Sequence, residues 1–136
     1  MLDHVGFPVS DLERSKAFYS AALAPLGYEL LFQASAQETG GESYAGFGAG
    51  IRAQFWIGTG TAIKGCVHFA FAAQTREAVA AFYDAAIVAG GRDNGAPGLR
   101  PQYHENYYGA FVLDPDGHNI EAVCHSPGQF EDQFKS

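Results

Sequence analysis

The residues best suited to chemistry are two histidines and a glutamate, placed in two stretches of the chain that resemble each other. His4 opens the first stretch and His68 opens the second, 64 positions later. Alternation of bulky and small residues predicts that both side chains lie on the sparse face of a strand. Glu121 lies on the equivalent face of a later strand, and Gln54 is its counterpart in the first stretch. We therefore expect the two imidazoles and the carboxylate to converge, with Gln54 as a candidate fourth ligand.

This donor set has a definite chemical meaning. Two neutral imidazoles and one carboxylate hold a divalent transition metal and leave coordination positions open for substrate or water. The predicted cofactor is a divalent metal ion, and Mn, Fe, Co, Ni and Zn all remain open. A lone histidine is more often a satisfied core or surface residue; the matched placement of His4 and His68 is what favours a metal site. His118 is predicted to be a solvated turn residue.

The elements that position these residues repeat the order strand, helix and three strands. In the first module, Val5, Phe7 and Val9 form the bulky face of the first strand. A helix follows, with Ser10 and Glu13 as a predicted capping box. We expect Pro25 and Gly27 to end this helix, a loop at 38–42, and strands at 28–33, 43–48 and 51–57.

The second module begins with a strand over residues 67–72. A helix is predicted to begin near Thr75 and to end at Gly90 and Gly91 in left-handed caps. We then expect a short strand near Arg92, a long loop over 94–106, and strands at 107–113 and 118–124. The Asp-Pro-Asp-Gly run at 114–117 predicts the turn between the last two strands.

Size, composition and charge limit the structural and functional classes to which this protein can belong. The chain has 136 residues, 47% of them hydrophobic and 17% charged, which fits one globular domain. The net charge of −7 disfavours nucleic acids and anionic membranes as partners, so a small-molecule substrate is expected. No signal peptide or long apolar span is evident, and two cysteines are too few for a disulfide framework. We expect the protein in the cytoplasm.

The predicted long loop is rich in hydrogen-bonding and aromatic groups. Arg100 is a candidate for recognising an anionic group of the substrate, because its planar fork suits a carboxylate or phosphate. Three further residues would line the mouth of the site: Tyr103, His104 and Tyr107. Trp56 would contribute an apolar wall. The alternative is a surface loop whose aromatic side chains merely pack, with Trp56 in the core.

Several motifs together resemble a known family. They are His4-Val5-Gly6, the run Ser10 to Ser15, Phe18-Tyr19, Gly27, His68, and Phe111 to Gly117 leading to Ile120-Glu121. This set resembles the vicinal oxygen chelate superfamily, which includes glyoxalases, bleomycin-resistance proteins, extradiol dioxygenases and fosfomycin-inactivating thiol transferases. The resemblance spans nearly the whole chain.

The resemblance implies an α+β fold in which two βαβββ modules form an open, cupped mixed sheet with helices outside. We expect residues 1–136 to form one such domain, with pseudo-repeats at about 1–60 and 65–126 and a short C-terminal tail. His4, His68 and Glu121 match family ligand positions, whereas Gln54 stands where glyoxalases often have a carboxylate. The resemblance also implies a homodimer, with the cup completed within one chain or between two.

The expected function is a divalent-metal-dependent, glyoxalase-like enzyme of lyase or isomerase type. Its small substrate would be chelated through neighbouring oxygens, and Glu121 would combine metal ligation with proton transfer. One alternative is a metal-free protein of the bleomycin-resistance type that sequesters a ligand. Another is a thiol transferase or dioxygenase of the same superfamily. The dioxygenases are commonly longer than this chain.

Overall fold

The computed structural model describes residues 1–61 and 63–128. The first module contains β1 (Val5–Pro8), α1 (Leu12–Leu23), the short 3-10 helix η1 (Ala24–Leu26), β2 (Glu29–Ala34), α2 (Ala36–Thr39), β3 (Tyr44–Gly48) and β4 (Phe55–Gly58). The second contains β5 (His68–Ala72), α3 (Arg76–Val88), β6 (Arg92–Leu99), β7 (Tyr108–Leu113) and β8 (Asn119–Cys124). Apart from η1 and α2, both modules follow the same element order.

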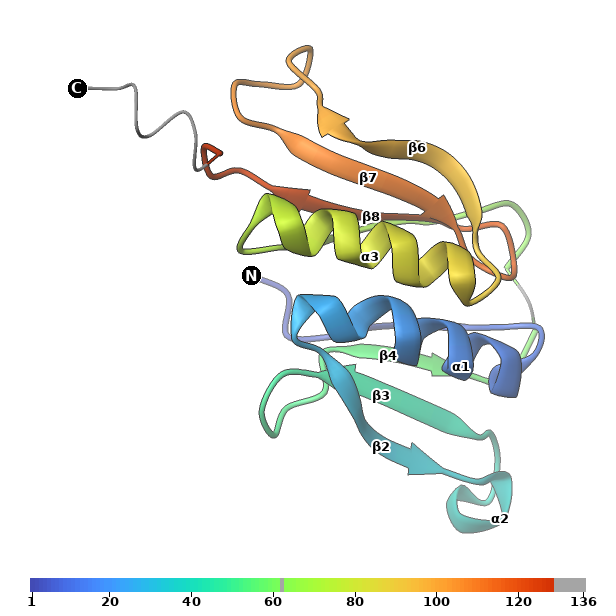
Figure 1. Cartoon of the computed structure of the whole chain (residues 1–136). Coiled ribbons are helices and arrows are strands. Elements are labelled where there is room, and N and C mark those ends of the chain that lie inside the picture. Colours follow the sequence, from blue (N-terminus) through green and yellow to red (C-terminus); the bar gives the residue numbers. More distant parts are fainter. Residues whose placement is uncertain (62, 129–136) are drawn as a thin grey trace.

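Each module forms a four-stranded mixed sheet. The strand orders are β1-β4-β3-β2 and β5-β8-β7-β6, and in each sheet the first pair is parallel and the others are antiparallel. The two sheets lie on either side of the paired helices α1 and α3 in Figure 1. The predicted α+β class with two βαβββ modules is confirmed.

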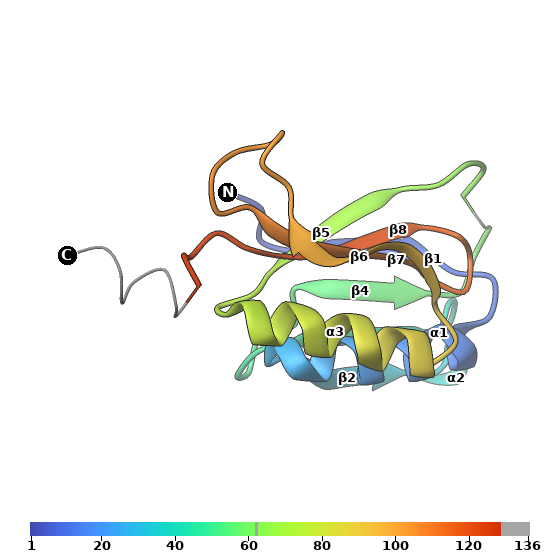
Figure 2. The same cartoon turned by 45° about the horizontal axis from the view of Figure 1, so that its top comes forward.

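One hydrophobic core joins the two modules. Phe18 and Tyr19 of α1 and Phe82 of α3 are fully buried in it. Phe7 of β1 stacks on Phe69 of β5, with ring centroids 5.2 Å apart, so aromatic packing links the edge strands of the two sheets. In Figure 2 the strands β5 to β8 form a layer over α3. Each sheet thus turns one face toward the helices, and the faces with His4 and His68 belong to different sheets.

The start of α1 differs from the prediction. Its N-cap is Asp11, whose carboxylate accepts a hydrogen bond from the backbone N–H of Arg14. The predicted capping box of Ser10 and Glu13 is therefore wrong. The Ser10 hydroxyl instead donates to the carboxylate of Asp116 in the second module, so it is not available to the helix. In α3 the predicted cap is present, because Thr75 accepts from the N–H of Ala78.

Three loop and strand boundaries also differ. The strand predicted near Arg92 continues as β6 to Leu99, into the first part of the region 94–106 predicted as loop. Two register shifts interrupt its pairing with β7, and Gly95, with φ of +148°, permits this irregular backbone. The predicted 38–42 loop begins inside the single helical turn α2, which Ser35 caps. The strand predicted from residue 51 begins only at Phe55.

The Asp-Pro-Asp-Gly turn connects the two modules as well as forming a hairpin. Asp114 is buried and accepts a hydrogen bond from the Tyr19 hydroxyl of α1. His118, predicted to be solvated, is also buried: its Nδ1 accepts from the N–H of Val67, and its ring lies edge-on to Phe7. The solvated-turn interpretation is wrong because this turn packs against the core.

Over residues 1–61 and 63–128, no helix is long and apolar enough to cross a membrane. The predicted C-terminal tail follows residue 126, and its residues 129–136 lie outside the described part of the chain.

Candidate metal and substrate site

The centre of the candidate site is the buried carboxylate of Glu121 on β8. Only 2% of this residue is exposed. Its Oε1 lies 3.1 Å from Nε2 of His68, and its Oε2 accepts a hydrogen bond from the hydroxyl of Tyr107. Burying a carboxylate is unfavourable unless it is paired and hydrogen-bonded. Both oxygens of Glu121 meet this requirement with partners from β5 and from the residue before β7.

His68 lies between two hydrogen-bond acceptors. Its Nδ1 is 2.9 Å from the carbonyl oxygen of Asn119, and its Nε2 faces the Glu121 carboxylate. A carbonyl only accepts hydrogen bonds, so Nδ1 carries a proton. A neutral imidazole has one N–H, which leaves the Nε2 lone pair facing Oε1 of Glu121. A proton or a cation between Nε2 of His68 and Oε1 of Glu121 satisfies this contact.

The register of β5 and β8 explains this contact. In the parallel pair, His68 lies opposite Asn119 and Ala70 lies opposite Glu121, so the small alanine leaves space beside the carboxylate. Gly109 on β7 leaves space on the other side. A Cβ added there would lie 3.3 Å from Oε2 of Glu121 and 3.2 Å from the Tyr107 ring.

Tyr107 stands at the centre of an aromatic group near the carboxylate. Burial and the hydrogen bond to Glu121 raise the pKa of the Tyr107 hydroxyl far above its usual value, so it stays a proton donor. Its ring has edge contacts to Tyr103, His104 and His125, with centroids 5.0, 5.2 and 5.3 Å away. His104 and His125 stack on each other at 4.7 Å.

Arg100 lies on the same sheet with its guanidinium held by the backbone. Its two Nη atoms donate to the carbonyls of Ala96 and Gly98, and the group lies 5.5 Å from the ring centroid of Phe111. Phe111 in turn stacks on the imidazole of His68, with centroids 6.3 Å apart. Arg100 is therefore next to the His68 surroundings, and its recognition of an anion remains a prediction.

His4 lies on the other sheet. Its side chain is 61% exposed and its Nδ1 lies 2.8 Å from Oδ1 of Asp3. This hydrogen bond, together with the charge of Arg52, lowers the pKa of the Asp3 carboxyl. His4 lines a hollow of about 600 Å³ with Trp56, Phe32 and other residues of sheet β1-β4-β3-β2. Gln54 lines a different hollow, next to Val5 and Ala70.

The three predicted metal ligands therefore do not converge within one chain. Among the described residues, no three His, Cys, Asp or Glu side chains form a group that could hold a metal. The structure brings together His68 and Glu121 but not His4, because His4 directly precedes β1 of the first sheet whereas His68 begins β5 of the second. Their joint role as ligands remains a prediction.

Comparison with known proteins identifies the family. The model of the Glyoxalase/Bleomycin resistance protein/Dioxygenase superfamily matches residues 1–122. The chain belongs to this superfamily. A search of curated proteins found no match.

Solved structures of the superfamily share the fold. A glyoxalase/bleomycin resistance protein from Albidiferax ferrireducens is 31% identical, with a TM-score of 0.72, and the match covers 93% of this chain and 99% of that one. Glyoxalase I from Zea mays is 22% identical with a TM-score of 0.68, over 90% of this chain and 43% of the maize protein. This chain therefore spans less than half of the maize enzyme.

A third structure of the same fold holds a metal. It is a glutamate-to-glutamine mutant of the fosfomycin resistance protein FosX from Listeria monocytogenes, in complex with Mn(II) and 1S,2S-dihydroxypropylphosphonic acid. It is 20% identical to this chain with a TM-score of 0.65, and the match covers 99% of this chain and 95% of FosX. At this identity the likeness concerns the fold.

Sequence reasoning about this superfamily member missed two contacts. It placed Tyr107 at the mouth of the site, whereas its hydroxyl binds Glu121. It gave Phe111 no role, although Phe111 lies opposite Glu121 in the β7–β8 register and contacts the His68 ring. Strand alternation on β7 would have put Phe111 on the same face as Glu121. In the predicted strand 107–113, Tyr107 shares the face of Phe111, but alternation could not show that its hydroxyl reaches Glu121.

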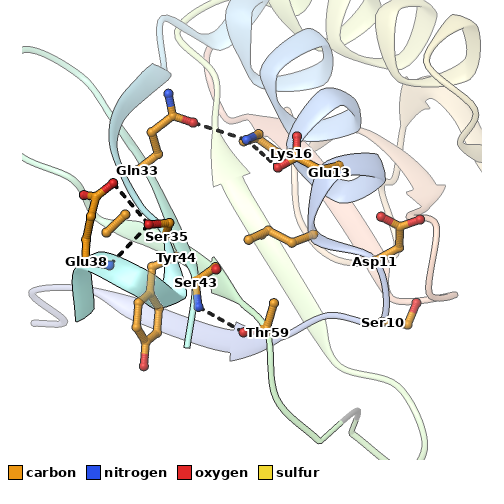
Figure 3. A pocket seen from close by; sticks show the side chains of 12 residues that line it. Ser10, Asp11, Glu13, Lys16, Gln33, Ser35, Glu38, Ser43, Tyr44 and Thr59 are labelled. Carbon is orange, nitrogen blue, oxygen red and sulfur yellow. Dashed lines mark hydrogen bonds and ion pairs between the residues drawn. The ribbon is translucent and has the colours of Figure 1, made fainter. Parts of the chain in front are cut away.

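Another hollow, of about 690 Å³, lies elsewhere (Figure 3). It is formed by the start of α1 and by β2, α2 and β3, and hydroxyls and carboxylates line it. Its lysine, Lys16, lies 2.9 Å from Oε1 of Glu13 and 3.2 Å from Oε1 of Gln33, so the positive charge is already paired. None of the predicted metal or substrate residues lines this hollow.

Proposed function

We propose that this protein is a divalent-metal-dependent enzyme of lyase or isomerase type. Its substrate is a small molecule that is held through two neighbouring oxygens, and its metal ligands are His4, His68 and Glu121. The observation that carries the proposal is the placement of His68 between two acceptors, with Nε2 aimed at a buried carboxylate. We place the protein in the cytoplasm.

The donor pair fits a metal. Ligand atoms at about 2.0–2.2 Å from a metal lie about 3 Å apart when they occupy neighbouring coordination positions. The 3.1 Å between Nε2 of His68 and Oε1 of Glu121 agrees with this spacing. The carbonyl of Asn119 holds the other ring nitrogen, as is usual for metal-binding histidines. When bound, the metal supplies Lewis acidity and a template for the substrate oxygens.

The remaining residues bind the substrate and move its proton. Glu121 accepts a proton from the substrate at Oε1, and Tyr107 fixes the carboxylate from the Oε2 side. Arg100 binds an anionic group of the substrate, while Tyr103 and His104 form the mouth. Trp56 forms the apolar wall beside His4. Gln54 is the candidate fourth ligand.

The proposal places the complete site between two copies of the chain. One chain offers His68 and Glu121 on its second sheet, and its own His4 lies on the first. A homodimer in which the His4 face of one copy meets the His68 face of the other supplies the third ligand. The superfamily resemblance supports a dimer of this kind.

Metal binding tests the proposal. We would remove metals with EDTA, dialyse the protein, and titrate Mn, Fe, Co, Ni and Zn ions in turn. We expect one ion per His68–Glu121 pair, measured by calorimetry and elemental analysis. His68→Ala and Glu121→Gln should each weaken metal binding by at least about 100-fold, because each removes one ligand of three.

His104→Ala is the matched control, since it also removes an imidazole near Tyr107 but leaves the proposed ligands in place. It should bind metal as the wild type does. If the wild type takes up no ion, or if His68→Ala binds as tightly as the wild type, the contact is an ordinary imidazolium–carboxylate pair and the proposal is wrong.

Metal-free sequestration of a ligand is a second candidate function. The exposed aromatic residues around the His4 hollow favour it, because such a surface binds ligands without any metal. Tight ligand binding by EDTA-treated protein, unchanged in Glu121→Gln and accompanied by no turnover with any metal, would support sequestration over catalysis.

A further inference from the structure

A row of aromatic residues and glycines crosses the first sheet. The register joins Phe32 on β2 to Gly46 on β3, Gly46 to Trp56 on β4, and Trp56 to Gly6 on β1. The six-membered ring of the Trp56 indole lies over Gly46. A Cβ added at Gly46 would be 2.7 Å from Cζ3 of Trp56, closer than real side chains approach. The glycine is therefore required for the indole to lie on the sheet.

A second ring lies on the same sheet in the same way. Tyr44 on β3 pairs with Gly58 on β4, and a Cβ at Gly58 would lie 2.8 Å from Cδ1 of Tyr44. Trp56 thus leans from β4 over β3, and Tyr44 leans from β3 over β4. In Figure 3 the Tyr44 ring points away from Lys16 and Glu13. We call Phe32, Tyr44 and Trp56 the aromatic platform.

The platform stays accessible although its rings cover the glycines. Phe32 is 53% exposed and Tyr44 is 41% exposed. The rings of Phe32 and Trp56 are nearly parallel, at 20°, with centroids 6.1 Å apart. Covering a glycine explains why a ring lies on the sheet. It does not explain why Phe32 and Tyr44 are also this exposed, and exposed apolar patches of this kind mark binding sites.

The hollow above the platform has the size and lining of a small-molecule site. Its volume of about 600 Å³ falls in the range of ligand pockets, about 300–1,000 Å³. Besides the three rings it is lined by His4, Gln33, Ala34 and Gly6, and none of these carries a permanent charge. Flat, near-parallel rings favour another flat ring, because aromatic groups prefer offset stacking.

We propose that the aromatic platform binds a planar, uncharged aromatic ring by stacking. The inference rests on the proposed function in one respect, since it names the class of group that the substrate carries next to its chelating oxygens. Phe32 and Trp56 provide the stacking surface, Tyr44 borders it, and His4 and Gln33 mark the polar edge where the rest of the substrate lies.

Trp56 is the single tryptophan of the chain and reports binding directly. We would titrate EDTA-treated protein with nitrobenzene and with nitrocyclohexane, which share the nitro quencher but differ in ring planarity. We expect saturable quenching of Trp56 emission by nitrobenzene, with a dissociation constant about tenfold lower than that of nitrocyclohexane. Because no metal is present, the result does not depend on the metal site.

Gly46→Ala tests the platform, because the added methyl displaces the indole. It should weaken nitrobenzene binding about tenfold. Gly41→Ala is the matched control: nothing lies within 4 Å of an added Cβ, and binding should not change. If circular dichroism shows that Gly46→Ala is unfolded, Phe32→Leu replaces it, since this exposed side chain can be exchanged on the surface, and the same loss is expected.

Three results would overturn the inference: no saturable quenching, equal affinity for the planar and the puckered ring, or wild-type affinity in both Gly46→Ala and Phe32→Leu. Metal uptake at His68 and Glu121 is measured separately, so loss of ring selectivity with intact metal uptake refutes this inference alone.

Discussion

At Glu121, a buried carboxyl group is contacted by side chains from two separate segments. His68 approaches one oxygen from β5, and the Tyr107 hydroxyl approaches the other from the end of the preceding loop. Since the pKa of Tyr107 is raised, its O–H keeps donating over the whole neutral range. The orientation of the carboxylate therefore depends on a residue that does not itself reach the proposed metal.

Replacing Tyr107 tests this dependence. Tyr107→Phe removes the donor and leaves the ring, so we expect metal affinity to fall about 10- to 100-fold, as for other residues that orient a ligand. The protein should also lose about 1–3 kcal/mol of unfolding free energy, because a buried acceptor loses its partner. Calorimetric metal titration and urea unfolding measure the two effects.

The control for this experiment is Tyr103→Phe, because Tyr103 is exposed and touches Tyr107 only through its ring. It should change neither quantity. Unchanged metal affinity in Tyr107→Phe would show that Tyr107 only packs beside the site.

Among the elements, the 114–117 turn joins two strands and also binds the first module through hydrogen bonds. Oδ1 of Asp114 accepts the N–H groups of Asp116 and His118 and so shapes the turn, while Oδ2 accepts the hydroxyl of Tyr19 from α1. Asp116 accepts from Ser10 at the start of the same helix. The turn of the second module thereby fixes the helix of the first.

This connection predicts a loss of stability at high pH. Burial, reinforced by the charge of Asp114, raises the pKa of Tyr19 well above its usual value. The folded state therefore keeps a proton that the unfolded state releases above about pH 10. The stabilisation is fully present below about pH 10 and is lost as the pH rises toward the pKa of the folded state. Urea unfolding between about pH 8 and pH 11 should show this decline.

Tyr19→Phe separates this effect from general alkaline unfolding. The variant should be about 1–3 kcal/mol less stable at about pH 8, because Asp114 loses a donor, and its stability should fall less steeply with pH. Tyr44→Phe, which changes a half-exposed tyrosine, should keep the wild-type slope. Equal slopes for Tyr19→Phe and the wild type would contradict the assignment.

In the whole molecule, the candidate ligands lie on the faces of two different sheets. His4 borders the aromatic platform, whereas His68 and Glu121 form a pair on the second sheet. A single chain therefore presents two incomplete halves. In a symmetric dimer, the same surfaces of both copies meet twice, so two complete sites would form together.

Mixing two inactive variants tests this arrangement. His4→Ala and His68→Ala should each lack tight metal binding alone. After joint unfolding and refolding, mixed dimers should regain it, because one of their two sites combines an intact His4 with an intact His68 and Glu121. Light scattering checks that dimers form. Failure of the mixture to bind metal, with dimers present, would show that the site is not shared.

Much of the fold followed from local patterns. Alternation predicted that His68 and Glu121, on two different strands, face the same side, and the duplicated order of elements predicted both modules. The sequence could not show how the modules pack, because that depends on contacts such as Phe7 with Phe69 between distant strands. The bulged β6 strand was missed for a related reason, since its glycines resemble a loop until β7 pairs with them.

The hydrogen bonds from α1 to the 114–117 turn make the two modules unequal. The hydroxyls of Ser10 and Tyr19 in the first module donate hydrogen bonds, and the carboxylates of Asp116 and Asp114 in the second accept them. The corresponding stretch of the first module, around residues 48–51, contains no carboxylate. It therefore has no acidic side chain that could accept hydrogen bonds from α3 in the same way. Across this contact, the first module donates the hydrogen bonds and the second module accepts them. Neither module is therefore expected to fold stably as a separate fragment.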